Sequence, residues 1–201
     1  GTVQALFALT ASRHKVNFVT SGNGFDDFDS VWTAALNASE EGKVTHFAML
    51  HLDIMPLIQD EEPIWLDTLM AELEAGDLDL VSAICPLKDF TGVTSSGIGD
   101  PKNPWECWRR ITMSELPSLP NTFTAADLGY GPEYPLLHNT GCWAADLRKS
   151  VFHQADEAGT CKAFFAFPER VYRHPLTNKW MHGRESEDWF FSRCMHQLGA
   201  K

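Results

Sequence analysis

The sequence has no apolar run near the roughly 20 residues that a bilayer-spanning helix needs, and it shows no secretory signal peptide. It is also poor in basic residues, with 16 Lys and Arg against 27 Asp and Glu and a formal net charge of -11. This balance disfavours non-specific attraction to nucleic acid and to anionic membranes. We therefore expect a soluble, cytoplasmic protein with no nucleic-acid partner and no transmembrane segment.

Cysteines are few, odd in number and never closely paired. A disulfide framework needs an even set, and a zinc ribbon needs two closely spaced pairs. We expect all five to be reduced core residues: Cys85, Cys107, Cys142, Cys161 and Cys194.

Several catalytic signatures are also missing. Gly92, Gly97 and Gly99 do not form a dinucleotide fingerprint or a phosphate loop at a strand-to-helix junction, and there is no Ser-His-Asp signature. Internal repeats are absent. With 201 residues, 44% of them hydrophobic, the chain is long enough for one substantial core, so we expect residues 1–201 to form a single domain.

The most informative stretch is the hydrophobic run at residues 44–54. Within it, residues 47–50 have no polar face, which is typical of a central parallel strand covered on both sides. The run ends in His51-Leu52-Asp53, and ligands of open α/β sheets bind outside the carboxyl ends of such strands. We therefore expect the chemistry at Asp53.

The flanking pattern alternates strands and amphipathic helices. Strands are predicted at residues 16–20, 44–50 and 78–84, with helices between them, and this alternation favours parallel pairing. The second of these helices would start near Pro63, bury Leu66, Leu69, Met70 and Leu73, and end in a left-handed cap at Gly76. The prediction is an α/β fold with a Rossmann-like, mixed but mostly parallel sheet flanked by helices. An amphipathic helix is expected at residues 2–12, so the sequence opens without the usual first strand of an α/β domain.

The second half is less regular. Residues 86–135 lack periodicity, and we interpret them as short strands with a loop that covers the substrate. Further predictions are a strand at 139–145, a helix at 146–158 capped by Asp146, a strand at 164–167 and a final helix from Ser186. Residues 170–185 are interpreted as a polar lead-in to that helix.

His51 and Asp53 are candidate metal ligands, since they point to the same side of an extended strand. Two protein ligands with phosphate oxygens and water suit Mn²⁺ or Mg²⁺. The alternative for Asp53 is a cap on the next turn. His182 and His174 are candidate third ligands, with an exposed loop histidine as the alternative in each case.

Glu187 and Asp188 are candidate catalytic carboxylates at the start of the last helix. Trp189 and the two phenylalanines after it would desolvate a neighbouring carboxylate and make it a better base. The structural alternative is that both acids stabilise the helix dipole. Asn139, Thr140 and Gly141 offer an amide, a hydroxyl and open backbone for a polyhydroxylated ligand, and a plain turn also explains them.

Three segments together resemble the GT-A glycosyltransferases, in particular the family 2-like members of bacteria and phages. Residues 45–56, with His51-Leu52-Asp53, are similar to the family's strand that ends in Asp-x-Asp. Residues 139–143 resemble its donor- and acceptor-lining segment, and residues 186–191 its Glu-Asp motif. The sequence differs from the family at His51, which replaces the first Asp, and at Trp32-Thr33, where many relatives have Arg-Asn.

The resemblance implies transfer of a sugar from a nucleotide-sugar donor to an unknown acceptor. A divalent metal on Asp53 would hold the donor diphosphate, and Asp188 would be the base, with Glu187 beside it. Asn139, Thr140, Gly141 and Trp189 would line the substrate. The alternatives are a degenerate relative that binds sugar nucleotide or carbohydrate without turnover and, from another class, a metal-dependent nucleotidyltransferase or hydrolase.

Overall fold

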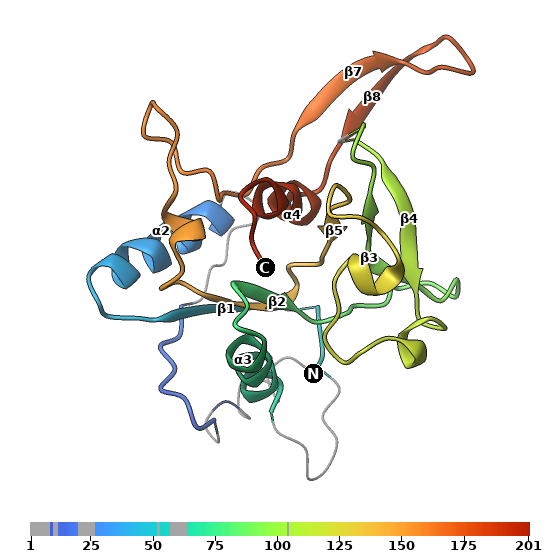
Figure 1. Ribbon diagram of the computed structural model, residues 1–201. Coiled ribbons are helices and arrows are strands. Elements are labelled where there is room, and N and C mark those ends of the chain that lie inside the picture. The colour runs from blue at the N-terminus through green and yellow to red at the C-terminus, as the bar shows by residue number, and fades with distance from the viewer. Residues whose placement is uncertain (1–8, 10–11, 20–26, 52, 57–63, 104) are drawn as a thin grey trace.

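The computed structural model describes residues 9, 12–19, 27–51, 53–56, 64–103 and 105–201 (Figure 1). Its central sheet has three strands in the order β1-β6-β2. They are β1 (His46–Leu50), β6 (Cys142–Asp146) and β2 (Leu80–Ser82). Both outer strands pair antiparallel with β6.

All five residues of β6 are buried, because helices cover both faces of the sheet. Side chains alternate along a strand, so Trp143 and Ala145 face one side and Cys142 and Ala144 the other. The first pair packs with α2 (Asp27–Glu40) and α4 (Glu187–Gln197). The second pair packs with α3 (Trp65–Gly76). The result is a helix-sheet-helix arrangement, visible in Figure 1.

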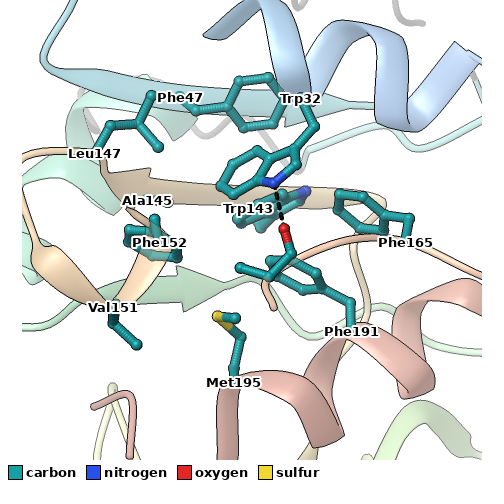
Figure 2. Packing of buried hydrophobic residues seen from close by; sticks show 11 residues of the cluster. Trp32, Phe47, Trp143, Ala145, Leu147, Val151, Phe152, Phe165, Phe191 and Met195 are labelled. Atoms are coloured by element: carbon teal, nitrogen blue, oxygen red, sulfur yellow. Dashed lines mark hydrogen bonds between the residues drawn. The ribbon is translucent and has the colours of Figure 1, made fainter. Parts of the chain in front are cut away.

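The larger core is aromatic (Figure 2). Trp32 on α2 is 1% exposed, and its indole N–H donates to the Ala163 carbonyl at 2.6 Å. Its ring meets Phe47 and Phe191 edge-on, at centroid distances of 5.3 and 5.7 Å. Phe165 stacks on Phe191 at 4.3 Å. This cluster fixes α4 against the sheet and so positions the start of that helix.

A second antiparallel sheet has the order β4-β3-β5. Its strands are β3 (Val93–Gly99), β4 (Cys107–Thr112) and β5 (Leu136–Leu137). Residues 86–135 therefore contain two strands, followed by 3₁₀ turns at Leu116–Ser118 and Ala126–Leu128. The third sheet is a hairpin of β7 (Glu169–Arg173) and β8 (Trp180–Arg184), which projects from the body in Figure 1.

The predicted GT-A, Rossmann-like, mostly parallel sheet is wrong. Every strand pair among the described residues is antiparallel, in sheets of three, three and two strands. β1 and β2 do run in the same direction, but β6 lies between them and β1 is at the edge of the described sheet. The alternation of strands and helices shows the order of elements, but it does not show that a later strand enters between two earlier ones.

Several element predictions also need correction. Residues 16–19 and 164–167 form no strand, and Thr20 lies outside the described residues. Asp146 ends a strand and starts no long helix, since only a 3₁₀ turn at Ser150–His153 follows. The expected polar lead-in at 170–185 is largely the β7–β8 hairpin. Of the opening helix at 2–12, all but residues 9 and 12 lie outside the described residues.

The two best-patterned helices were predicted close to their observed bounds. α3 buries the expected Leu66, Leu69, Met70 and Leu73. Its left-handed cap is Asp77, with φ of 48°, whereas the sequence favoured Gly76 in that role. α4 begins at Glu187, one residue after the Ser186 from which the helix was expected to start.

Candidate functional site

Asp188 lies in the first turn of α4, half-buried, with its two carboxylate oxygens in different roles. Oδ1 accepts the backbone N–H of Trp189 at 2.8 Å and the hydroxyl of Ser186. Oδ2 accepts the side-chain amide of Asn139 at 3.3 Å. One oxygen therefore contacts an N–H of the first helical turn, as the helix-dipole alternative expects, while the other faces a different segment of the chain.

Asn139 connects that carboxylate to the end of β1. Its Oδ1 accepts the backbone N–H of Gly141 at 2.7 Å, and the Gly141 carbonyl accepts the backbone N–H of His51 at 2.7 Å. A Cβ on Gly141 would lie 2.6 Å from Asn139 Oδ1 and 3.0 Å from Ile54. A glycine is needed here because the two segments approach so closely.

His51 is close enough to Asp53 and to Asp188 to interact with both. It interacts electrostatically with both Asp53 and Asp188, and its Nε2 is buried with no hydrogen-bond partner. Cys85 interacts electrostatically with the same two acids. Asp53 and Asp188, which are 135 residues apart in sequence, therefore flank one region of the molecule.

Burial determines the protonation of this region. Desolvation raises the pKa of Asp188 above its usual range, although hydrogen bonds from Ser186 and Trp189 oppose the rise. Desolvation also raises the pKa of Glu187 and lowers that of His51. The imidazole is thus biased toward its neutral form, whose second nitrogen is a free acceptor, as a metal ligand or a hydroxyl partner requires.

Asp53 has a partner that the sequence did not suggest. Lys88 Nζ lies 2.6 Å from Asp53 Oδ2, and both side chains are exposed. This hydrogen bond is the main cause of the lowered pKa of Asp53. Lys88 was missed because it lies in the segment without periodicity, and nothing local to it marks a contact with the end of β1.

Of the expected substrate-lining residues, Trp189 already makes other contacts and Thr140 is buried. The Trp189 indole N–H donates to the Ser95 carbonyl at 3.1 Å, and the Arg110 guanidinium lies 4.6 Å from the centre of its ring. Thr140 is 1% exposed, and its hydroxyl has no partner. Trp189 thus joins α4 to β3 and β4, while Thr140 lies beneath the surface.

The remaining candidate ligands lie elsewhere. His182 is on the exposed β8 strand, 3.6 Å from Glu169 Oε2, and His174 is in the turn of the same hairpin. Within the described ranges, no group of three or more His, Cys, Asp or Glu side chains is arranged to hold a metal ion. Of the four predicted metal ligands, His51 and Asp53 are therefore the two that lie near each other.

Trp32, at the position where many GT-A relatives have Arg, is a core residue. Its indole N–H donates a hydrogen bond to the Ala163 carbonyl. Because the side chain is also uncharged, this position offers no cationic contact to a diphosphate.

A cavity of about 710 Å³ lies near this region but is not lined by Asp53 or Asp188. Its lining comes from β2, from residues 121–134, from His138 after β5, and from one face of α4 that includes Ser192. The Ser192 hydroxyl lies 2.7 Å from the Asp188 carbonyl, and that of Ser82 donates to the Asn139 carbonyl. The cavity thus lies behind the backbone that presents Asn139 and Asp188.

No protein-family model, no curated protein and no solved structure matches this chain. Within the described part of the chain, no helix has the length and apolar character needed to cross a bilayer.

Proposed function

We propose that the protein transfers a sugar from a nucleotide-sugar donor to a hydroxyl acceptor, with Asp188 as the general base. One observation carries the proposal: a desolvated carboxylate, oriented by Asn139 and Ser186, flanks the same region as His51 and Asp53. The resemblance of the three sequence segments to GT-A enzymes gives the reaction class.

The chemistry requires a base because a hydroxyl is a poor nucleophile until its proton is removed during attack on the anomeric carbon. A positioned carboxylate typically contributes about 10² to 10⁴ in rate. Asp188 meets two conditions for this role, since its pKa is raised toward neutrality and two donors fix its orientation. Glu187, which is also desolvated, would lie beside the acceptor.

The donor diphosphate needs a cation, and the chain offers two sources. His51 Nε2, a buried nitrogen without a partner, and the Asp53 carboxylate fit a Mn²⁺ or Mg²⁺ ion that takes its other ligands from phosphate and water. When bound, such an ion would neutralise the charge of the leaving diphosphate. The second source is Lys88, whose ammonium group already lies at Asp53 and would have to release it to admit a metal.

A sugar-nucleotide-binding protein without turnover is the second candidate. The Lys88–Asp53 ion pair and the separate location of His182 favour it, since the metal set expected for a transferase is reduced to two side chains.

Calorimetry against a panel of nucleotide sugars, with and without Mn²⁺, tests both candidates when it is combined with a donor-hydrolysis and transfer assay. Donor binding with transfer or hydrolysis supports the transferase. Binding without either reaction supports the second candidate. Failure of every nucleotide sugar to bind would overturn both.

A further inference from the structure

The β7–β8 hairpin combines basic side chains with exposed apolar ones. Residues 169–184 contain four Arg and Lys and one Glu, a net charge of +3, although the whole chain carries -11. They also carry four of the ten large hydrophobic side chains that are exposed in the described part of the molecule: Val171, Leu176, Trp180 and Met181.

The pairing register determines what each face presents. Val171 pairs with His182 and Arg173 with Trp180, so these four side chains share one face. Val171 is 70% exposed and Trp180 65% exposed. The opposite face contains Arg170, whose guanidinium lies 4.7 Å from the centre of the Trp105 ring. Arg170 thus contacts the body from one face of the hairpin, while Val171 and Trp180 are exposed on the other.

The turn extends the exposed face. His174 and Lys179 close it through a 2.9 Å backbone hydrogen bond, and Leu176, at its end, is 90% exposed. Lys179 follows Leu176 closely in sequence, so a cation and an aliphatic side chain end the hairpin together. No core contact accounts for an exposed leucine on a projecting turn (Figure 1).

We propose that this hairpin docks the protein on an anionic phospholipid surface. In this arrangement Leu176 and Trp180 enter the interfacial layer, while Arg173 and Lys179 contact the headgroups. This inference rests on the hairpin alone and does not depend on the proposed transferase activity.

The net charge of -11 would repel the protein from an anionic surface, but the length of the hairpin reduces this repulsion at its tip. Five paired residues at about 3.3 Å each place the turn about 17 Å beyond the base of the hairpin. That distance exceeds the Debye length of about 8 Å at physiological ionic strength, so the acidic body is largely screened from a surface that the tip touches. A flat membrane can be reached by the tip alone.

A nucleic acid fits the same hairpin less well. A polyanion longer than the tip would run along the acidic body, where it is repelled. The Arg173 guanidinium also lies over the Trp180 ring, 4.5 Å from its centre, and this leaves less of the ring for base stacking.

Co-sedimentation with vesicles tests the proposal. The full chain should pellet with phosphatidylcholine vesicles that contain phosphatidylglycerol and stay in solution with pure phosphatidylcholine. Arg173→Gln with Lys179→Gln should lower the partition coefficient about 25-fold, or about fivefold for each charge. Leu176→Ser should lower it by roughly tenfold. All three side chains are on the exposed hairpin, and circular dichroism checks that the fold is kept.

The matched control is Lys43→Gln with Lys162→Gln, which changes the net charge equally at exposed positions outside the hairpin. It should leave vesicle binding unchanged. The proposal is overturned if the protein does not pellet with anionic vesicles, if the control loses as much binding as the hairpin variant, or if Leu176→Ser has no effect. Binding to a single-stranded oligonucleotide but not to vesicles would also overturn it.

Discussion

The side-chain amide of Asn139 donates a hydrogen bond to Asp188 Oδ2 at 3.3 Å, and its oxygen accepts the backbone N–H of Gly141 at 2.7 Å. One side chain thus connects the carboxylate of the last helix to the loop that holds the end of β1. The amide can make both bonds because it has a donor and an acceptor, whereas a carboxylate could only accept.

Asp188→Asn should abolish transfer while donor binding is kept. The amide retains an oxygen for the Trp189 N–H but cannot take a proton, so we expect the rate to fall by about 10² to 10⁴. The free energy of unfolding should change by about 1 kcal/mol or less, since one hydrogen bond is altered and a buried charge is removed. Transfer kinetics, donor calorimetry and urea denaturation measure the three quantities. Asp156→Asn, in an exposed turn, is the control, and near-normal transfer by Asp188→Asn would remove Asp188 as the base.

Ser186→Ala should move the acidic limb of the pH–rate profile to higher pH. The Ser186 hydroxyl donates to Asp188 Oδ1 and lowers a pKa that burial raises, so its loss raises that pKa further. A base acts only when deprotonated, and activity would then disappear at a higher pH as the solution is acidified. Profiles of kcat/KM against pH for Ser186→Ala, Ser186→Thr and the exposed Ser118→Ala test this. Only the alanine at position 186 should shift the limb, and an unshifted limb contradicts the assignment.

Mn²⁺ should strengthen donor binding through His51 and Asp53 and not through His182. His51→Ala and Asp53→Asn should each weaken the metal-dependent part of the affinity by roughly tenfold or more, since both remove a ligand. His182→Ala is the matched histidine control, because that side chain lies on the hairpin beside Glu169. Calorimetry of donor binding with Mn²⁺ and after chelation provides the readout. An equal effect of all three substitutions, or no effect of Mn²⁺ on the native protein, would leave Lys88 as the cation for the diphosphate.

Phe191→Ala should destabilise the protein by about 3 to 5 kcal/mol, the usual cost of truncating a buried phenylalanine. Phe191 is fully buried, stacks on Phe165 and meets the Trp32 ring edge-on, so its removal leaves a cavity behind the first turn of α4. Phe90→Ala, at a fully exposed position, should change the stability by about 0.5 kcal/mol or less. Urea unfolding followed by circular dichroism compares the two, and similar midpoints would show that this cluster does not control stability.

The sequence alone was sufficient for features that depend on local periodicity. The stripe of Leu66, Leu69, Met70 and Leu73 predicted α3, and Phe191 with Met195 predicted the buried face of α4, because apolar residues three and four apart share one side of a helix. The position of Asp188 in the first helical turn was determined in the same way.

Strand pairing and the composition of the site were decided by the tertiary structure. The sequence pattern of β1 and β2 does not show that β6, which begins 60 residues after the end of β2, lies between them. Because β6 pairs antiparallel with both strands, the predicted parallel pairing of β1 with β2 does not form. The contact of Lys88 with Asp53 and the location of His182 on a projecting hairpin also depend on the tertiary structure. A residue's own neighbours in sequence determine its secondary structure and exposed face, but its partner from a distant segment is selected by the packing of the whole core.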